Sequence, residues 1–474
     1  MDNKELKQYF ELNCKPSASE RSGQKLGPEY ECLVLIPDRK DASGQSYRPL
    51  GTDEQDGVPG VLRRFQEIGS MRGEVWEGKF EGENLIGLQN QEGASITIEP
   101  GGQIELSDQP MDHLSQVETS IRNFVRDLKE SLRPIQGRLM FLGAQPLFDL
   151  DAIALSPKKR YRIMYRHMAE VGSLGQWMMK ATAGTQLSLD YASLEDLERK
   201  FRVLCRLSPF LTAIFSNSPL HLGKPSGFKS FRNHIWQNTD GTRSGIPGAF
   251  IRKDFTIEDY IDWALLASPY HLNRQGEIHE LMDHSFRNLM DGSYPQIKTD
   301  FEDWKDHLGM LFPEIRIKNI IEIRSIDTLN PEYVLAIPAL LQALIYDETV
   351  FGKLESMMMD LPENEFPWYQ QVAARDGLAG QVNQVNFSHF AKKLMEMALE
   401  SLTLSEGCRL ALFFDRYTRH GLSPADLVLE RFYSADENPL KWIHKELQSD
   451  EEKQSSFINF PCDVDENPTS WVSH

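Results

Sequence analysis

The feature that most constrains this chain is a set of carboxylates spaced two residues apart in strand-like segments. In residues 27–36, Glu29 and Glu31 flank Tyr30. Side chains alternate between the two faces of a strand, so both glutamates share one face while Tyr30 and Cys32 take the other. This spacing predicts a sheet with one face that packs on helices and a second face that collects carboxylates.

The same pattern recurs in a predicted hairpin. Residues 95–99 and 103–107 are typical of strands, and Pro100-Gly101-Gly102 separates them as a turn. Glu99 and Glu105 lie on the faces opposite the aliphatic side chains. We expect the turn to bring these two carboxylates close together.

Two later segments add polar groups. Residues 185–191 place Gln186 on a polar face, and residues 315–324 place Glu322 and Arg324 together, opposite isoleucines. Clustered carboxylates repel one another unless cations neutralise them. Hard oxygen ligands suit Mg²⁺ or Mn²⁺, and Mg²⁺ commonly accompanies nucleotide phosphates. Periodicity alone leaves open a second interpretation, in which these are solvated faces of edge strands.

The charge balance excludes some classes of partner. The 474 residues include 51 Lys+Arg and 70 Asp+Glu, a formal net charge of −19. We do not expect such a chain to bind nucleic acid by neutralising phosphates, or to dock on an anionic membrane. An anionic small substrate remains compatible, provided that metal ions or arginines reverse the field in one cleft.

Cysteine use and the N-terminal residues predict a cytoplasmic location. The five cysteines are scattered and form no CxxC pair, which favours a reducing compartment. The first residues lack the apolar core of a signal peptide and the Arg- and Ser-rich character of a transit peptide. The longest apolar stretch, residues 334–346, is too short to span a bilayer.

Helical periodicity dominates the C-terminal part, because almost the whole pattern from residue 331 onward is helical. Residues 450–474 are acidic and polar, which predicts a partly disordered tail. Phosphate-loop, dinucleotide-fingerprint and nucleophile-elbow motifs are absent from the sequence. His279 and His284 are five residues apart and leave a common helix face, so zinc binding is not expected.

Motifs that occur in order between residues 25 and 350 are more specific than any single pattern. They are Gly27-Pro28-Glu29-Tyr30-Glu31, Glu99-Pro100-Gly101-Gly102-Gln103-Ile104-Glu105-Leu106-Ser107, Pro157-Lys158-Lys159-Arg160-Tyr161-Arg162-Ile163-Met164, Val171-Gly172-Ser173-Leu174-Gly175, Gln186-Leu187-Ser188-Leu189-Asp190-Tyr191, Phe215-Ser216-Asn217-Ser218-Pro219, Gly223-Lys224-Pro225-Ser226-Gly227-Phe228, Arg232-Asn233-His234-Ile235-Trp236, Ile315-Arg316-Ile317-Lys318 and Glu322-Ile323-Arg324. Together they resemble the glutamate–cysteine ligase family, in its plant-type and proteobacterial branch. The family usually has His where this chain has Tyr30, a position predicted to point away from the acidic face.

The resemblance implies an α+β fold like that of glutamine synthetase. Its curved, mainly antiparallel sheet has an acidic concave face and is backed by helices. We expect a catalytic domain over residues 1–350 and a helical region over residues 351–474 that packs on it.

The resemblance also implies a reaction. ATP phosphorylates the side-chain carboxylate of L-glutamate, and the amine of L-cysteine attacks the acyl phosphate to give γ-glutamylcysteine, ADP and phosphate. Mg²⁺ or Mn²⁺ is the expected cofactor, and the three small molecules are the expected partners of a monomer or homodimer. Two alternatives remain open: the same chemistry with another amine acceptor, and an inactive relative that serves as a binding or regulatory subunit.

Site residues follow from the motifs of the resembled family. The implied metal ligands are Glu29, Glu31, Glu99, Glu105, Glu322 and, more weakly, Gln186. The implied catalytic residues are Arg324, which stabilises charge on the phosphoryl group, and Arg243, which reaches the phosphates. Arg232 is expected to bind the α-carboxylate of glutamate, and Trp236 and Tyr270 to line the substrate pocket.

Overall fold

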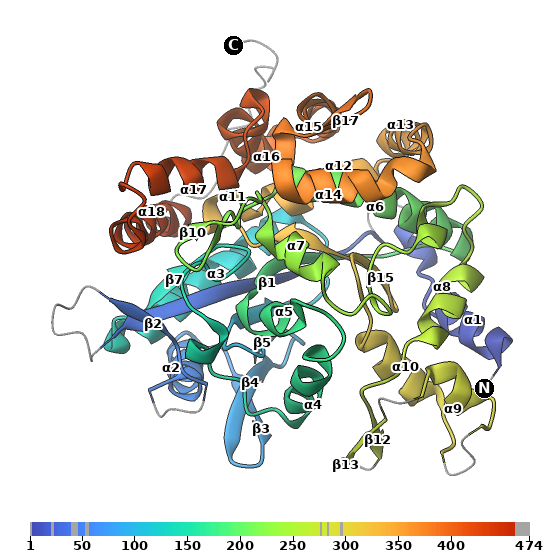
Figure 1. The fold of residues 1–474 in the computed structure, drawn as a ribbon, viewed down its shortest axis with the longest axis horizontal. Helices are drawn as coiled ribbons and strands as arrows, with labels where there is room; N and C mark the ends of the chain where they lie inside the picture. Colours follow the sequence, from blue (N-terminus) through green and yellow to red (C-terminus); the bar gives the residue numbers. More distant parts are fainter. Residues whose placement is uncertain are drawn as a thin grey trace.

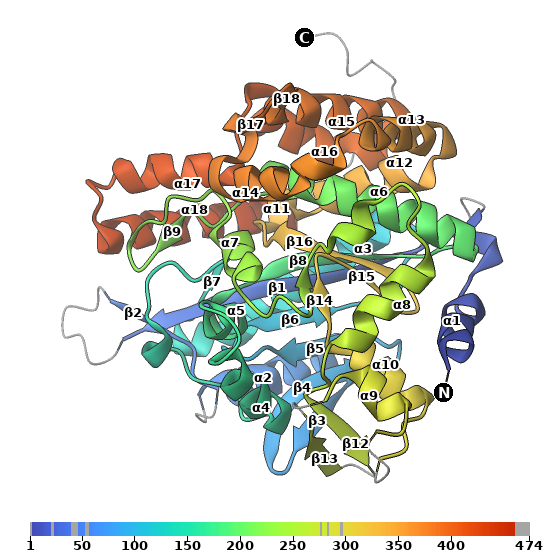
Figure 2. The same ribbon diagram turned by 45° about the vertical axis from the view of Figure 1, so that its right-hand side comes forward.

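The fold is organised by a mainly antiparallel sheet, as Figures 1 and 2 show. The computed structural model describes residues 2–19, 23–38, 46–52, 56–274, 277–281, 284–293 and 297–459. In these residues the sheet has ten strands, eight of them in one continuous path and two paired with β1 off that path. The path is β15 (Ile315–Ile317), β16 (Ile321–Asp327), β8 (Gly184–Leu189), β1 (Leu26–Pro37), β6 (Ile104–Ser107), β5 (Ser95–Ile98), β4 (Asn84–Asn90) and β3 (Trp76–Glu81), and β2 (Tyr47–Pro49) and β7 (Arg138–Met140) pair with β1. The predicted α+β class with a mainly antiparallel sheet is confirmed.

The strand register places the polar side chains on one face. Glu31 on β1 is directly opposite Glu105 on β6, and Glu29 is opposite Gln186 on β8. Residues opposite one another in an antiparallel pair project from the same face of the sheet. The alternation in the sequence therefore predicted correctly which carboxylates share a face.

The opposite face of the sheet is apolar and packs on helices. Tyr30 is fully buried there, stacks on Phe141 and donates a hydrogen bond from its hydroxyl to the carbonyl of Leu329 at 2.6 Å. Burial raises the pKa of the neighbouring Cys32 thiol, which is inert at neutral pH. Helices with buried side chains in this apolar core include α2 (Val58–Met71), α3 (Leu114–Leu132), α6 (Leu194–Ile214) and α12 (Ala336–Tyr346).

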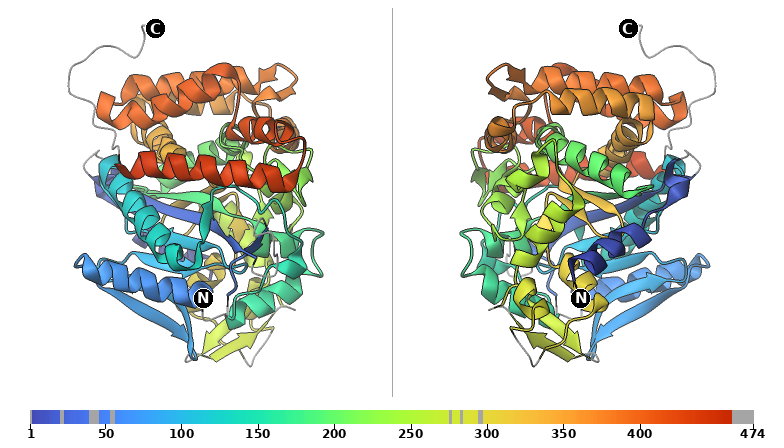
Figure 3. Two further views of the ribbon diagram at one scale, coloured as in Figure 1. Left: turned by 90° about the vertical axis from the view of Figure 1, so that its left-hand side faces the viewer. Right: turned by 90° about the vertical axis from the view of Figure 1, so that its right-hand side faces the viewer.

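Shorter elements cover the acidic face, and α4, α5 and α7 lie in front of the sheet in Figure 1. They are α4 (Lys159–Met168), α5 (Gly175–Ala181), α7 (Phe231–Gln237), α10 (Phe301–Gly309), β12 (His271–Arg274), β13 (Glu277–Glu280) and β14 (Phe312–Pro313). Each contributes side chains to a cavity between itself and the sheet. The N-terminal helix α1 (Asn3–Leu12) and α8 (Ile257–Leu266) lie on the side of β15, as the right-hand view of Figure 3 shows.

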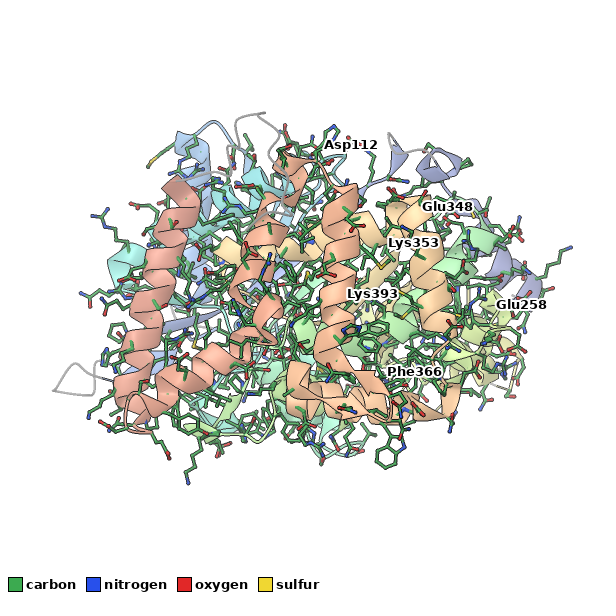
Figure 4. All side chains as sticks on the ribbon, turned by 90° about the horizontal axis from the view of Figure 1, so that it is seen from above. Asp112, Glu258, Glu348, Lys353, Phe366 and Lys393 are labelled. Carbon is green, nitrogen blue, oxygen red and sulfur yellow. The ribbon has the colours of Figure 1, made fainter. Side chains whose placement is uncertain are left out.

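Helices form the C-terminal part, as predicted, and lie above the sheet in Figure 3. They are α11 (Pro331–Val334), α13 (Glu348–Met359), α14 (Phe366–Asp376), α15 (Phe387–Ser401), α16 (Leu404–Arg416), α17 (Pro424–Tyr433) and α18 (Pro439–Asn459). Figure 4 looks onto this layer, with Lys353 on α13 and Lys393 on α15 labelled. One apolar core joins side chains from before and after residue 350. The division of the chain at that residue remains a proposal.

The prediction places the start of the disordered tail too early in the chain. Residues 450–459 belong to α18, where Asp450, Gln454 and Phe457 are buried. Residues 460–474 lie outside the described residues. Buried Trp442, Ile443, Leu447 and Phe457 form an apolar stripe on α18, and the buried polar side chains Asp450 and Gln454 lie between Leu447 and Phe457 in the sequence. This face holds the helix on the body of the protein.

No single helix in the described ranges is long and apolar enough to cross a membrane. Residues Pro331–Tyr346 and Glu348–Met359 meet the length and composition criteria only as a pair, and the pair is bent by 89°.

Asp450 anchors α18 at an energetic cost that depends on pH. Its Oδ1 accepts a hydrogen bond from the Asn330 side chain at 2.8 Å, and its buried Oδ2 has no partner. Burial, followed by the nearby Glu446 carboxylate, raises the pKa of Asp450 to about 7. The ordinary value is about 3.9. Between these two pH values the folded state keeps a proton that the unfolded state has lost, so stability falls as pH rises through this window.

Asp450→Asn should therefore raise the Tm, by an amount that grows from about pH 4 to about pH 7 and is constant above that. Calorimetry across this range measures the gain. The matched variant Glu446→Gln should instead lower the Tm, because Glu446 pairs with Arg431 through two contacts of 2.6 and 2.7 Å. A gain for Asp450→Asn that does not change with pH would contradict the assignment.

Candidate active site

A cavity of about 640 Å³ lies against the acidic face of the sheet. The strands supply its polar floor, while α4, α5, α7 and α10 supply the walls. The predicted site residues that line it are Glu29, Glu31, Glu99, Glu105, Gln186, Arg232, Trp236, Tyr270 and Arg324. Segments separated by nearly 300 residues in the chain thus meet in one cavity.

The carboxylates on the floor raise one another's proton affinity. Burial, followed by repulsion from Glu99, raises the pKa of Glu31 to about 7. The same two causes raise the pKa of Glu105 well above its usual range. Burial, followed by repulsion from Glu322, also raises the pKa of Glu29. Nearby protein cations therefore do not offset the cost of ionising Glu29, Glu31 and Glu105 together.

Protein donors hold two of these carboxylates in place. Glu31 accepts hydrogen bonds from the Gly184 N–H at 2.6 Å and from the Gln186 side chain at 3.2 Å. Glu105 accepts hydrogen bonds from the hydroxyls of Ser107 at 2.8 Å and Thr97 at 3.2 Å. The carboxylates are therefore oriented before any ligand arrives.

The donor chemistry of this floor fits a hard divalent cation. Carboxylate and amide oxygens are the ligands that Mg²⁺ prefers, and a bound cation would offset both the burial and the repulsion that raise the pKa values. Within the described ranges, no three His, Cys, Asp or Glu side chains converge closely enough to form a closed metal cage. Mg²⁺ characteristically keeps waters and substrate phosphates among its ligands, so an open arrangement of carboxylates suits it.

Glu322 lies deeper and does not line the cavity. Arg316, directly opposite it on β15, makes two contacts of 2.6 and 3.0 Å, and Arg324 makes one of 3.1 Å. Burial alone would raise the pKa of Glu322, but Arg316, Lys318 and Arg324 hold it well below its usual range. In this structure Glu322 holds the guanidiniums of Arg316 and Arg324 in position. Its role as a metal ligand stays a prediction.

Arg232 brings a buried guanidinium to the cavity with hydrogen-bonding capacity to spare. Its Nη2 donates to the Arg324 carbonyl at 3.0 Å, whereas its buried Nε has no partner. Gly184 makes room for it, because a Cβ at that position would lie 2.5 Å from Nη2. The indole N–H of Trp236 and the hydroxyl of Tyr270 are also buried without a partner. Three unpaired polar groups around one cavity are typical of a site for a polar ligand.

Arg243 lies behind the cavity wall. Its guanidinium donates to Asp240 at 2.7 Å and to the Ser268 carbonyl at 2.9 Å, and it stacks over the Tyr270 ring at 4.1 Å. These contacts make Arg243 a support for Tyr270. The prediction that it reaches the phosphates remains untested, and no free donor of Arg243 faces the cavity in this arrangement.

Sequence reasoning did not assign several groups that line the cavity. They are Arg160, Tyr161, His271, Lys305, Asp306, Arg316 and Lys318. The sequence could have identified Arg316, because pairing residues 315–317 with 321–323 as a hairpin places Arg316 opposite Glu322. Lys318 follows directly after the first of these two strands. The others come from elements that reach the cavity only through tertiary packing.

Comparison with known proteins shows where the chain belongs. The family model described as "Glutamate-cysteine ligase family 2(GCS2)" matches residues 25–454. A protein of Brassica juncea named "Glutamate--cysteine ligase, chloroplastic" is 34% identical over 442 residues, which cover 91% of this chain and 81% of that protein. The corresponding protein of Nicotiana tabacum is 32% identical over 443 residues, covering 91% and 80%.

The chain belongs to the glutamate–cysteine ligase family 2. The predicted family is thereby confirmed. A solved glutamate–cysteine ligase of Francisella tularensis, crystallised with AMP, has a TM-score of 0.54 at 13% identity and covers 93% of this chain and 90% of that one. This likeness confirms the predicted fold class for this family 2 member. The plant relatives are named chloroplastic, so they do not support the predicted cytoplasmic location, which stays a prediction.

Neutralising one floor carboxylate should reveal the repulsion directly. At neutral pH we expect Glu105→Gln to raise the Tm of the metal-free protein by about 2 °C, because a buried carboxyl group with a raised pKa destabilises the fold above its unfolded pKa of about 4.3, and the amide does not titrate. It should also reduce the further rise in Tm that MgCl₂ produces in the parent. Differential scanning fluorimetry with and without Mg²⁺ measures both effects.

Glu77→Gln on β3, where the side chain is exposed, is the matched control and should change neither quantity. A metal-free Glu105→Gln protein less stable than the parent, with an unchanged response to Mg²⁺, would show that the floor does not bind cations.

Proposed function

We propose that this protein ligates the γ-carboxylate of L-glutamate to the amine of L-cysteine, with hydrolysis of ATP to ADP and phosphate. The observation that carries the proposal is the meeting of an acidic sheet face with the Arg232 and Arg324 guanidiniums in one cavity. Membership of the family supports the same reaction. Such a cavity suits two anionic reactants that must be brought together.

The floor residues are the proposed metal ligands. Glu29, Glu31, Glu99, Glu105 and Gln186 offer oxygen atoms to Mg²⁺ or Mn²⁺. The bound cation would neutralise the triphosphate and thereby lower the barrier to phosphoryl transfer. Hydrogen bonds from Gly184 and Gln186 fix Glu31 before the metal binds, so the chain does not have to reorder that ligand.

The first chemical step forms an acyl phosphate. A γ-carboxylate oxygen of glutamate attacks the γ-phosphorus of ATP, and the bond from that phosphorus to the β–γ bridging oxygen breaks as ADP leaves. Arg324 faces the cavity beside this floor, and its planar guanidinium can donate to two phosphoryl oxygens. Arg316 and Glu322 hold the strand pair that carries it.

In the second step the neutral amine of cysteine attacks the acyl carbon. The bond from that carbon to the phosphate oxygen breaks, phosphate leaves, and the amine nitrogen gives up one proton. Arg232, with its unpaired Nε, is the proposed partner of the glutamate α-carboxylate, and Trp236 and Tyr270 complete that pocket. Fixing the α-carboxylate orients the γ-carboxylate toward the phosphate.

An acceptor panel tests the proposal. ADP release with L-glutamate, ATP and Mg²⁺ should depend on L-cysteine and should cease without glutamate. Mass spectrometry of the product should show γ-glutamylcysteine. Turnover with another amine but not with cysteine would replace the acceptor, whereas no turnover with any amine and no binding of Mg·ATP would favour an inactive relative.

Arg324→Ala should lower kcat by roughly 10²–10³, because it removes a donor to developing charge. The fold should be retained, as judged by circular dichroism and Tm. Arg419→Ala, which removes an exposed arginine paired with Asp415, is the control and should leave kcat unchanged. Near-parental kcat for Arg324→Ala would refute the role of this residue.

A further inference from the structure

Asp327 is a buried carboxylate that the proposed chemistry does not use. It ends β16, is 1% exposed and does not line the cavity. Its Oδ2 accepts hydrogen bonds from the Asn217 N–H at 2.8 Å and the Ser218 hydroxyl at 2.6 Å, and its Oδ1 accepts one from the Ser230 hydroxyl at 2.8 Å. A buried carboxylate with three converging donors is a fixed anchor point for the segments that supply them.

Ser218 and Ser230 connect Asp327 to the first turn of α7, because each also accepts a hydrogen bond from a backbone N–H of that turn. Ser230 caps the helix, and its Oγ accepts the Asn233 N–H at 3.1 Å. The Oγ of Ser218 accepts the N–H of Arg232 itself at 3.0 Å. The backbone of Arg232 is therefore two hydrogen bonds away from Asp327. An α-helix of only seven residues depends on such contacts for its position, because its own turns contribute little stability.

The position of Asp327 is set by the sheet. Asp327 pairs with Gly184, the residue that binds Glu31 and makes room for the Arg232 guanidinium. Gly143 lies on the other side, where a Cβ would come within 2.3 Å of the Asp327 carboxyl carbon. A register shift between Ile323 and Ile326 separates the Arg324 end of β16 from the Asp327 end. The same strand thus carries one residue to the cavity and one to the helix that faces it.

We propose that Asp327 is the positioning residue of the glutamate clamp: through Ser218 and Ser230 it fixes the first turn of α7, and with it the guanidinium of Arg232. This inference rests on the proposed function, in which Arg232 binds the α-carboxylate of glutamate. Asp327 acts by geometry, since its oxygens contact the serines and the Asn217 backbone and not the substrate.

Steady-state kinetics of three variants test this role. Asp327→Ala removes the anchor and should raise the KM for glutamate by about tenfold or more, with kcat and the KM for ATP within about threefold of the parent. Asp327→Asn keeps the shape and an acceptor oxygen for Ser218, so the KM for glutamate should return to within about threefold of the parent. Ser218→Ala leaves the carboxylate but breaks the link to Arg232, and its KM for glutamate should lie between those two.

Gly143→Ala offers a route to the same effect without touching a polar group. The added methyl must displace the Asp327 carboxylate, so this variant should reproduce the rise in the KM for glutamate. Asp127→Ala removes a buried carboxylate of α3 that pairs with Arg72 and does not line the cavity, so it should leave both KM values unchanged, although it alters stability.

Three results would overturn the inference. They are an unchanged KM for glutamate in Asp327→Ala, an equal rise in the KM values for glutamate and ATP, and a defect in Asp327→Asn as large as in Asp327→Ala. Arg232→Met separates this inference from the proposed function. If its KM for glutamate is unchanged, the clamp itself is wrongly assigned, whereas a raised KM together with a silent Asp327→Ala rejects only the role of Asp327.

Discussion

Repulsion among the carboxylates on one sheet face is the interaction on which the rest of this structure depends. Glu29, Glu31 and Glu105 on the strands, and Glu99 directly after β5, line one cavity. Burial raises the pKa of Glu29, Glu31 and Glu105, and repulsion adds to it, from Glu322 for Glu29 and from Glu99 for the other two. The apolar face behind them, packed on helices, supplies the stability that keeps this arrangement folded. The carboxylates are kept apart by the sheet and lack a full complement of counter-charges, which is the condition a divalent cation relieves.

The arginines around the cavity divide into two kinds. Arg243 and Arg316 donate hydrogen bonds to protein partners. Arg243 also stacks on Tyr270, and Arg316 binds Glu322. Arg232 is buried yet keeps an unpaired Nε, and Arg324 faces the cavity from a strand shared with Asp327. Arg243 and Arg316 thus support neighbouring side chains, whereas Arg232 and Arg324 are the proposed substrate contacts. The hydrogen bonds around Asp327 belong to the supporting structure.

Much of the floor could be predicted from the sequence, because strand periodicity alone determines which side chains share a face. The Glu29–Tyr30–Glu31 alternation and the Pro-Gly-Gly turn between residues 99 and 103 are local signals, and the register bears them out. The walls could not be predicted in this way. Arg160, His271 and Asp306 come from short elements that meet the floor only by tertiary packing, and α18 hides its apolar stripe in a polar sequence. The role of Arg243 followed from the family resemblance alone, which does not determine the direction in which a buried side chain points.

In the proposed reaction, this acidic cavity transfers a phosphoryl group from ATP to the γ-carboxylate of glutamate. Glutamate labelled with ¹⁸O in the γ-carboxylate tests it most directly, with mass spectrometry of the inorganic phosphate released during turnover with cysteine. An acyl phosphate requires a carboxylate oxygen to leave with phosphorus, so the released phosphate should carry the label. Unlabelled phosphate during coupled formation of γ-glutamylcysteine would contradict it.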